Sequence, residues 1–312
     1  MNDSSPVAEI QSVRVDESSR GRVLTRWEGR HIGLPELSIG ARAEDWVSAI
    51  HQLLSDDFDS PSRTMLKTSG GKQVFRTPAV VGNQTVDVVV KRRREGGALG
   101  GWPRRILGCR ESRMFDAAVR LLRCGILTPP PLAVIERTGP ECESFLITLA
   151  VPGGQDLETI LSSRIWELEP TDAWRAKGRI IRALSSMCLA MQQNGVEHRD
   201  FKASNMMVTN WMDARACPRL WLIDLEGVRF GRRARNTSVL PRSIIRLAAS
   251  LVHCRGVTRS DALRWIRLWL EMGGSSEWSA KALWKDGQRR VDTYLQKSRR
   301  RKRGKIDGYS NP

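Results

Sequence analysis

Residues 198–205 read H-R-D-F-K-A-S-N, and a later apolar run ends in D-L-E-G, beginning at Asp224. Transfer of a phosphoryl group needs a carboxylate beside the attacking hydroxyl and oxygen ligands that hold Mg²⁺ on the phosphates. Asp200 would orient and deprotonate the acceptor hydroxyl, and Lys202 would meet the charge of the transferring phosphate. Asn205 and Asp224 would supply oxygen ligands, which Mg²⁺ prefers. The spacing therefore predicts phosphoryl transfer.

A loop whose Asp and Asn side chains merely cap turns is the alternative interpretation. Chance can produce H-R-D in a basic protein. The five-residue step from Asp200 to Asn205 and the apolar run that ends at Asp224 are much harder to obtain by chance. Together they match the catalytic loop and the metal-binding motif of protein kinases, which favours an enzyme.

Lys91 is the candidate for holding the nucleotide phosphates. It ends the run Val88-Val89-Val90, which resembles the V-A-I-K strand whose lysine contacts the α- and β-phosphates. A solvated basic run is the alternative, because three arginines follow. Gly70 and Gly71 form a turn signal upstream, and they are expected to approach the phosphates through their backbone although the G-x-G-x-x-G form is missing.

An acidic partner for Lys91 is expected on the helix predicted over residues 110–123. Glu111 is the glutamate near the start of this helix, and Asp116 lies farther along it. Either could be a surface charge, since a glutamate near a helix N-terminus is favourable for the dipole alone. Glu111 is the predicted partner.

The secondary structure that must position these residues changes character along the chain. Hydrophobic patterning predicts β-structure in the first half, at residues 64–92, 132–135 and 145–149, with a helix over 45–54. Apolar stripes with helical spacing predict three helices in the second half, at residues 180–191, 244–252 and 263–270. A β-rich part joined to a helical part predicts an α+β, bilobal fold with a β-rich N-lobe and a helical C-lobe.

Four segments follow from this division. Residues 1–22 are predicted to be a disordered lead-in, since they mix Ser, Asp, Glu and Arg. Residues 23–149 form the N-lobe with an N-terminal extension, and residues 150–296 form the C-lobe with the catalytic loop. Residues 297–312 form a basic tail.

With these motifs in hand, the chain resembles the lipopolysaccharide core kinases, that is, the Kdo and heptose kinases with a protein-kinase-like fold. The resemblance covers about residues 64–303. Residues 121–129 resemble the family's L-x-x-x-G-I-x-T-P, and residues 224–229 match its D-L-E-G-V-R. Residues 246–251 resemble its R-L-x-x-S-L, and residues 264–267 its R-F-L-R.

The resemblance implies phosphorylation of a sugar hydroxyl of lipid A–core, dependent on ATP and Mg²⁺, at the cytoplasmic face of a bacterial inner membrane. It also implies that the backbone of Leu149 and Val151 contacts adenine. The family usually has an acidic residue at Leu149, a loss that backbone contacts tolerate. The family's usual helix glutamate also does not align with a matching position here. The resemblance therefore leaves the acidic partner of Lys91 open.

The net charge indicates an anionic partner. The chain has 51 Lys plus Arg against 34 Asp plus Glu, a formal charge of +17. Residues 297–305 hold seven basic side chains in nine positions. Near an acidic membrane such side chains contribute about 1 kcal/mol each, so this run is predicted to hold the enzyme on an anionic membrane surface. A solvated tail or a nucleic-acid patch is the alternative, and the catalytic loop disfavours nucleic acid.

Cysteine spacing and hydropathy exclude several other classes. The six cysteines are scattered without a C-x-x-C pair, so neither zinc nor a disulfide framework is expected. No apolar stretch approaches the roughly 20 residues of a membrane span, and no signal-peptide pattern opens the sequence. A cytosolic protein, or one on the cytosolic side of a membrane, is expected.

The sequence leaves two competing functions open. One is an atypical protein serine/threonine kinase, although no A-P-E follows Asp224 and residues 231–239 are short and basic for an activation segment. The other is a catalytically silent kinase-like protein that only binds lipid or nucleic acid. The joint presence of Lys91, Asp200, Asn205 and Asp224 argues against silence.

Overall fold

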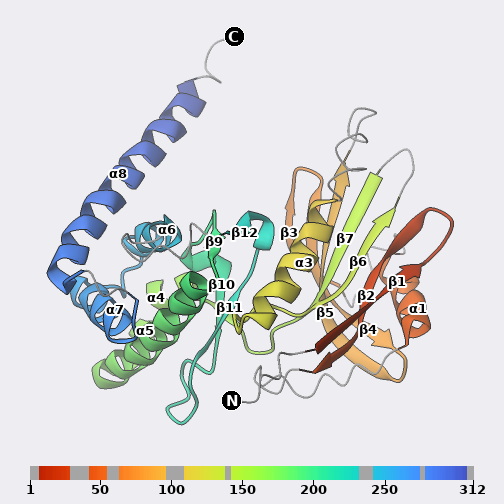
Figure 1. Ribbon diagram of the computed structural model, residues 1–312, viewed down its shortest axis with the longest axis horizontal. Helices are drawn as coiled ribbons and strands as arrows, with labels where there is room; N and C mark the ends of the chain where they lie inside the picture. The colour runs from red at the N-terminus through yellow and green to blue at the C-terminus, as the bar shows by residue number, and fades with distance from the viewer. Residues whose placement is uncertain are drawn as a thin grey trace. The chain divides into compact units, whose positions relative to one another are not determined.

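A computed structural model describes residues 7–28, 42–54, 63–95, 109–137, 142–231, 242–274 and 278–307. The chain divides into two compact units, Met1–Val151 and Pro152–Pro312. The first is rich in sheet and the second is mainly helical (Figure 1). Most of the segment 231–239, expected to be short and basic, lies outside the described residues.

The first unit is built on a seven-stranded antiparallel sheet in the order β1-β2-β6-β7-β5-β4-β3. The strands are β1 Val7–Arg14, β2 Ser19–Glu28, β3 Thr64–Ser69, β4 Lys72–Val81, β5 Gln84–Glu95, β6 Pro131–Arg137 and β7 Cys142–Leu149. Gly70 and Gly71 join β3 to β4 with φ of 50° and 73°. Such a two-residue turn requires positive φ at both positions, which glycine adopts without strain.

Two helices cover opposite faces of this sheet, α1 (Ala43–Leu54) and α3 (Arg110–Arg123). Side chains alternate between the two faces of a strand. On β5, Val88 and Val90 therefore point into the core beneath α1, whereas Lys91 contacts α3. Figure 1 shows α3 lying across the front of the sheet. The alternation decides which basic residues of β5 meet α3.

The disordered lead-in predicted for residues 1–22 is wrong over its described part. Residues 7–14 and 19–28 form a hairpin, and β2 pairs with β6. Val13 and Val23 are buried in the core beneath α1. The hairpin is ordered because its outer residues are polar and its inner residues join an existing core.

The second unit surrounds the H-R-D segment with helices and short strands. Its helices are α4 Leu157–Ser162, α5 Pro170–Gln193, α6 Arg242–Leu251, α7 Arg259–Glu271 and α8 Ala280–Asp307. Its strands are β8 Gln155–Asp156, β9 Val196–His198, β10 Met206–Thr209, β11 Arg219–Leu222 and β12 Val228–Phe230. The described part of this unit also contains 3₁₀ turns at Arg164–Glu167, Ala203–Asn205 and Leu225–Gly227.

α8 continues without a break to Asp307, so the described part of the basic tail predicted from residue 297 is helical. Figure 1 shows the end of α8 extending beyond the other helices of its unit. Among the described residues, no helix has both the length and the apolar character to cross a membrane.

Candidate active site

The H-R-D segment follows β9 and leads into β10, so two short strands fix its ends. β9 pairs with β12, and β10 pairs with both β11 and β8. The backbone N–H of Arg199 donates to the Gly227 carbonyl at 2.9 Å, and that of Ile223 donates to the Asn205 carbonyl at 2.9 Å. The loop and the segment that begins at Asp224 are thus held together by main-chain hydrogen bonds.

Asp200 stands at the centre of this arrangement. Its Oδ2 atom lies 2.8 Å from the Lys202 ammonium. The Asn205 side-chain amide donates to the Asp200 carbonyl at 2.8 Å and to Oδ2 at 3.1 Å. The structure therefore brings Asp200, Lys202 and Asn205 into one hydrogen-bonded group.

The charge state of Asp200 follows from these contacts. Partial burial raises the pKa of the carboxyl. The hydrogen bond and positive charge of Lys202, together with the amide of Asn205, lower the pKa by more than burial raises it. The net pKa lies below the ordinary value of 3.8. A carboxylate that is ionised at neutral pH and partly exposed can accept a hydrogen bond from an acceptor hydroxyl.

His198 orders the loop through hydrogen bonds to the backbone. The residue is fully buried, and its Nδ1 atom accepts a hydrogen bond from the Asp200 backbone N–H at 3.0 Å. Its Nε2 atom lies 3.1 Å from the Asp224 carbonyl oxygen, so Nε2 carries the proton and donates it. Burial lowers the pKa of His198, which favours this neutral tautomer.

Asn205 and Asp224 offer a donor set that suits Mg²⁺. The Asn205 amide nitrogen donates to Asp200, and the Oδ1 atom accepts no hydrogen bond within the described part of the chain. Asp224 is exposed, with φ 57° and ψ 66°, a left-handed conformation that is costly for a residue with a side chain. One carboxylate and one amide oxygen, completed by phosphate oxygens, match the ligands that Mg²⁺ takes in such sites.

Helix α6 supports the catalytic loop from behind, a feature that the sequence did not reveal. The Ser243 hydroxyl accepts from the His198 backbone N–H at 3.0 Å. The Ser250 hydroxyl accepts from the buried Ala203 N–H at 2.9 Å. Arg246 donates to the His198 carbonyl at 3.4 Å. These contacts give a physical reason for the R-L-x-x-S-L pattern at residues 246–251.

The predicted nucleotide-binding residues of the first unit lie on the sheet and α3. Lys91 is half-buried on β5, and its ammonium lies 3.7 Å from the Met114 sulfur on α3. In the β3–β4 turn, the Gly71 carbonyl accepts from the Arg94 N–H at 2.8 Å. A Cβ at Gly71 would lie 2.9 Å from the Arg94 oxygen, so the turn approaches β5 too closely for a side chain.

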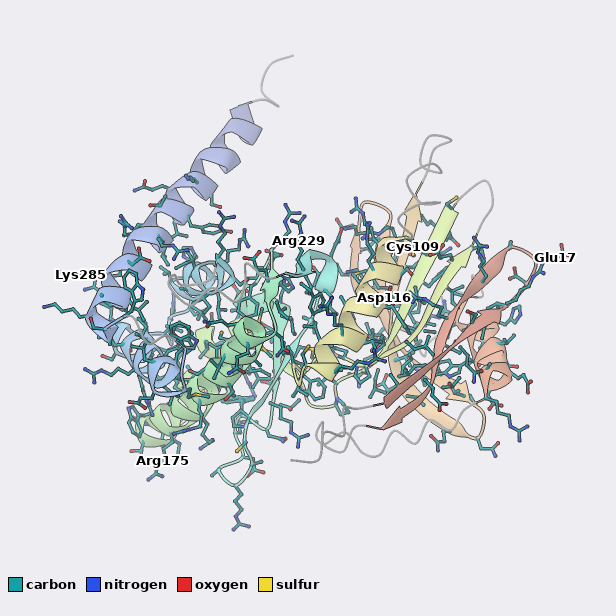
Figure 2. All side chains as sticks on the ribbon, viewed as in Figure 1. Glu17, Cys109, Asp116, Arg175, Arg229 and Lys285 are labelled. Atoms are coloured by element: carbon teal, nitrogen blue, oxygen red, sulfur yellow. The ribbon has the colours of Figure 1, made fainter. Side chains whose placement is uncertain are left out.

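The predicted pairing of Glu111 with Lys91 is not what the structure contains. Glu111 is 0% exposed, and its carboxylate binds Arg93 at 2.7 Å and the Ser144 hydroxyl at 2.7 Å. The reason is the register of α3, which places Glu111 opposite Arg93 and Met114 opposite Lys91. Asp116, the other acidic residue considered and labelled in Figure 2, binds Arg22 at 2.7 Å.

Leu149 and Val151, the predicted adenine contacts, lie at the end of the first unit. The Leu149 N–H donates to the Pro130 carbonyl at 2.9 Å, so this donor is already occupied. The Ala150 N–H likewise donates to the Asp87 carbonyl at 2.9 Å. The Val151 N–H has no acceptor among the described residues, so it could donate to a ligand.

A comparison with protein families decides what this arrangement is. The sequence model of the lipopolysaccharide kinase (Kdo/WaaP) family matches residues 104–269, just over half of the chain. The chain belongs to this family. It is therefore a kinase, an enzyme that transfers a phosphoryl group to an alcohol acceptor, and the resemblance inferred from the sequence motifs is confirmed. Family membership also implies ATP as the phosphoryl donor.

Two solved structures are similar to this chain. A chain described as WaaP in complex with acyl carrier protein has 22% sequence identity and a TM-score of 0.50, covering 76% of this chain and 88% of that one. WbdD has 17% identity and a TM-score of 0.42, covering 75% of this chain and 46% of that one. No curated protein matches the sequence.

The helical unit also contains an apolar pocket that the sequence did not predict. It has a volume of about 400 Å³ and is lined from α4, α5, α6, α7 and α8. Leu161, Leu184, Ala248 and Ile266 are among its lining residues. Helical stripes predict burial of such residues but not whether they fill the space between the helices.

Proposed function

We propose that this kinase transfers the γ-phosphoryl group of ATP to a Kdo or heptose hydroxyl of the lipid A–core of lipopolysaccharide. The observation that carries the proposal is the position of Asp200, which is ionised, partly exposed and held by Asn205 and Lys202. Family membership supplies the acceptor class. A protein-kinase-like arrangement of the two units belongs to the same proposal.

Each residue of the loop has a defined part in this reaction. Asp200 accepts a hydrogen bond from the acceptor hydroxyl, orients its oxygen toward the phosphorus and takes its proton. Lys202 stays beside Asp200 and offsets negative charge on the transferring group. The amide nitrogen of Asn205 keeps Asp200 in place, and its Oδ1 atom would bind Mg²⁺.

Further residues are proposed to hold the nucleotide and the metal. Asn205 and Asp224 would hold Mg²⁺, which when bound neutralises phosphate charge. Lys91 and the backbone around Gly70 and Gly71 would contact the phosphates, and the Val151 N–H would donate to adenine. Glu111 stabilises the sheet–helix contact around Arg93 rather than contacting ATP.

Anionic lipid is the proposed environment. The basic run of residues 297–305 lies in the last part of α8, and its charge suits an acidic surface at the cytoplasmic face of the inner membrane. Deleting residues 297–312 should weaken binding to vesicles that contain anionic phospholipid at low salt. Unchanged binding would remove this role from the run.

The acceptor is tested by phosphoryl transfer from labelled ATP. Purified lipid A–core and a general protein acceptor are compared, with the wild type and Asp200→Ala. We expect transfer to lipid A–core that depends on Asp200. Transfer to protein alone would favour a protein kinase, and no Asp200-dependent transfer to either would favour a silent binding protein.

Acyl carrier protein is a second proposed partner. The similar WaaP structure contains that protein, and the apolar pocket of about 400 Å³ has the character needed for an acyl chain. Purified acyl carrier protein with and without an acyl chain should differ in affinity for the kinase. Ala262→Phe, which places a ring in the pocket, should remove that difference. Equal affinities in the wild type would contradict the proposal.

A further inference from the structure

A group of cations in the helical unit lies between α6 and α8. The surface there forms a hollow of about 380 Å³. Its charged lining residues are Arg242, Arg246, Arg289, Arg290 and Lys297. Its hydroxyl-bearing lining residues are Thr293 and Tyr294. No motif in the sequence singled out this combination, because its members come from two helices separated by α7.

The positive charge around the hollow is only partly balanced. Asp286 binds Arg289 at 2.9 Å and Arg290 at 3.3 Å. Arg242 and Lys297 have no acidic partner in the part of the chain that the structure describes, and both are exposed. The five cations that line the hollow repel one another, and Asp286 pairs with two of them. An anion bound between the five would relieve this repulsion.

The spacing on each helix directs these groups to the same place. Arg242 and Arg246 are four residues apart on α6 and share a face of that helix. Arg290 and Lys297 are seven residues apart on α8, with Thr293 between them on the same face. Guanidinium groups bind phosphate through paired N–H donors, and hydroxyl groups add further donors.

The hollow is connected to the catalytic loop through α6. Arg246, which lines it, also donates to the His198 carbonyl at 3.4 Å. Ser243, one position after Arg242, accepts from the His198 N–H at 3.0 Å. A ligand anchored on Arg242 and Arg246 is therefore held by the helix that positions the loop of Asp200.

We propose that this hollow binds a phosphate group that the acceptor glycolipid already carries, and so positions the lipid for transfer at another hydroxyl. The inference rests on the proposed function, since it names a recognition site for the same acceptor. Convergent cations around a hollow suit a compact phosphate group. An acidic protein surface would instead match cations spread over an open face.

The test compares Arg242→Gln/Lys297→Gln with the wild type. Neither side chain has an ionic partner among the described residues, so we expect the fold to be retained. Lipid A–core and the same lipid after phosphatase treatment serve as acceptors. We expect the double variant to raise KM for the phosphorylated acceptor roughly 10-fold or more, since charge-assisted hydrogen bonds are lost. Removal of the acceptor's phosphates should raise KM for the wild type by a similar factor. The double variant should then show no further rise in KM when its acceptor is dephosphorylated.

Lys281→Gln/Lys285→Gln is the matched control. Both lysines are exposed on α8 outside the hollow, and Figure 2 labels Lys285 on that helix. This variant removes the same charge and should leave KM for both acceptors unchanged. An equal rise in KM in the control, or an equal effect of Arg242→Gln/Lys297→Gln on the dephosphorylated acceptor, would overturn the proposal.

A binding measurement separates this proposal from the proposed function. Calorimetry with inorganic phosphate, glucose 1-phosphate and glucose distinguishes free phosphate from a sugar phosphate. We expect glucose 1-phosphate to bind, glucose not to bind, and the double variant to weaken binding at least 10-fold even if the wild type phosphorylates neither lipid. If Arg242→Gln/Lys297→Gln lost affinity for acyl carrier protein but kept its affinity for these phosphate compounds, the hollow would be a protein-docking surface. That result would refute the proposal.

Discussion

The Lys202 ammonium lies 2.8 Å from Oδ2 of Asp200, two residues earlier in the chain. Lys202 thus stabilises the charged form of Asp200, the residue that we propose receives the acceptor proton. In the same proposal, this ammonium also meets the phosphate that approaches the acceptor.

Lys202→Met should shift the acidic limb of the pH profile of kcat/KM to higher pH. Burial alone raises the pKa of Asp200, and Lys202 is the main group that reverses this effect. Without it, Asp200 protonates at a higher pH and loses its ability to accept the hydroxyl proton. Lys281→Met, an exposed change of the same kind, should leave the limb in place. An unshifted limb in Lys202→Met would contradict this assignment.

Asp200→Asn should lower kcat by about 10²–10⁴-fold, the usual contribution of a positioned general base. The amide retains the shape of the carboxylate but cannot take a proton. Affinity for ATP, measured by fluorescence with a nucleotide analogue, should stay within about twofold because Lys91 and Asp224 are unchanged. A large loss of nucleotide affinity would instead assign Asp200 to binding.

The stability of the kinase should depend on pH through His198. The pKa of the buried imidazole is lowered from 6.5 in the folded state, so the unfolded chain binds a proton first as the pH falls. The free energy of unfolding is therefore highest above about pH 6.5 and falls as the pH decreases toward the folded pKa. Denaturant titrations at several pH values should show this slope.

His198→Gln should remove that slope, whereas the exposed His253→Gln should retain it. Protonation of His198 would place a hydrogen on Nδ1, where the Asp200 N–H now donates. The loop should therefore lose activity over the same pH range in which the wild type loses stability. Identical slopes for His198→Gln and the wild type would exclude this residue as the cause.

Local sequence was enough to predict the parts of the site that lie within one loop or one turn. The step from Asp200 to Asn205 is short, so its residue types already fix which groups can meet. The same holds for the Gly70-Gly71 turn and for the bounds of α3, where hydrophobic spacing and Gly125 mark the helix and its end.

Contacts that depend on the docking of distant elements could not be predicted in this way. Glu111 meets Arg93 instead of Lys91 because of the rotation of α3 on the sheet, which no local pattern records. The hairpin of β1 and β2 is ordered by β6, more than a hundred residues later. The support of the catalytic loop by Ser243 and Ser250 likewise bridges more than 40 residues.

Ser250→Ala should lower the free energy of unfolding by about 1–3 kcal/mol, since it leaves the buried Ala203 N–H without its acceptor. Ser186→Ala is a suitable control, because Ser186 is exposed and only contacts its own helix. That change should cost less than about 0.5 kcal/mol. Equal values from urea denaturation would show that Ser250 does not support the loop.

Glu111 and Lys91 should respond to substitution in different ways. Glu111→Ala removes the carboxylate from a buried pair with Arg93, and such a loss typically costs about 3–5 kcal/mol in the free energy of unfolding. Lys91→Met replaces a half-buried ammonium that lies against Met114 with an apolar side chain of similar length. It should leave stability nearly unchanged while raising KM for ATP and lowering kcat.

The double variant Arg93→Met/Glu111→Leu tests whether the pair acts only through structure. Replacing both partners by apolar groups of similar size removes the unpaired charge and should restore much of the stability lost in Glu111→Ala. If Glu111→Ala raises KM for ATP and the double variant returns both KM and stability toward the wild-type values, Glu111 positions the helix behind Lys91 without contacting the nucleotide. A double variant as stable as the wild type whose KM for ATP remains as high as that of Lys91→Met would show that Glu111 or Arg93 acts on the nucleotide itself.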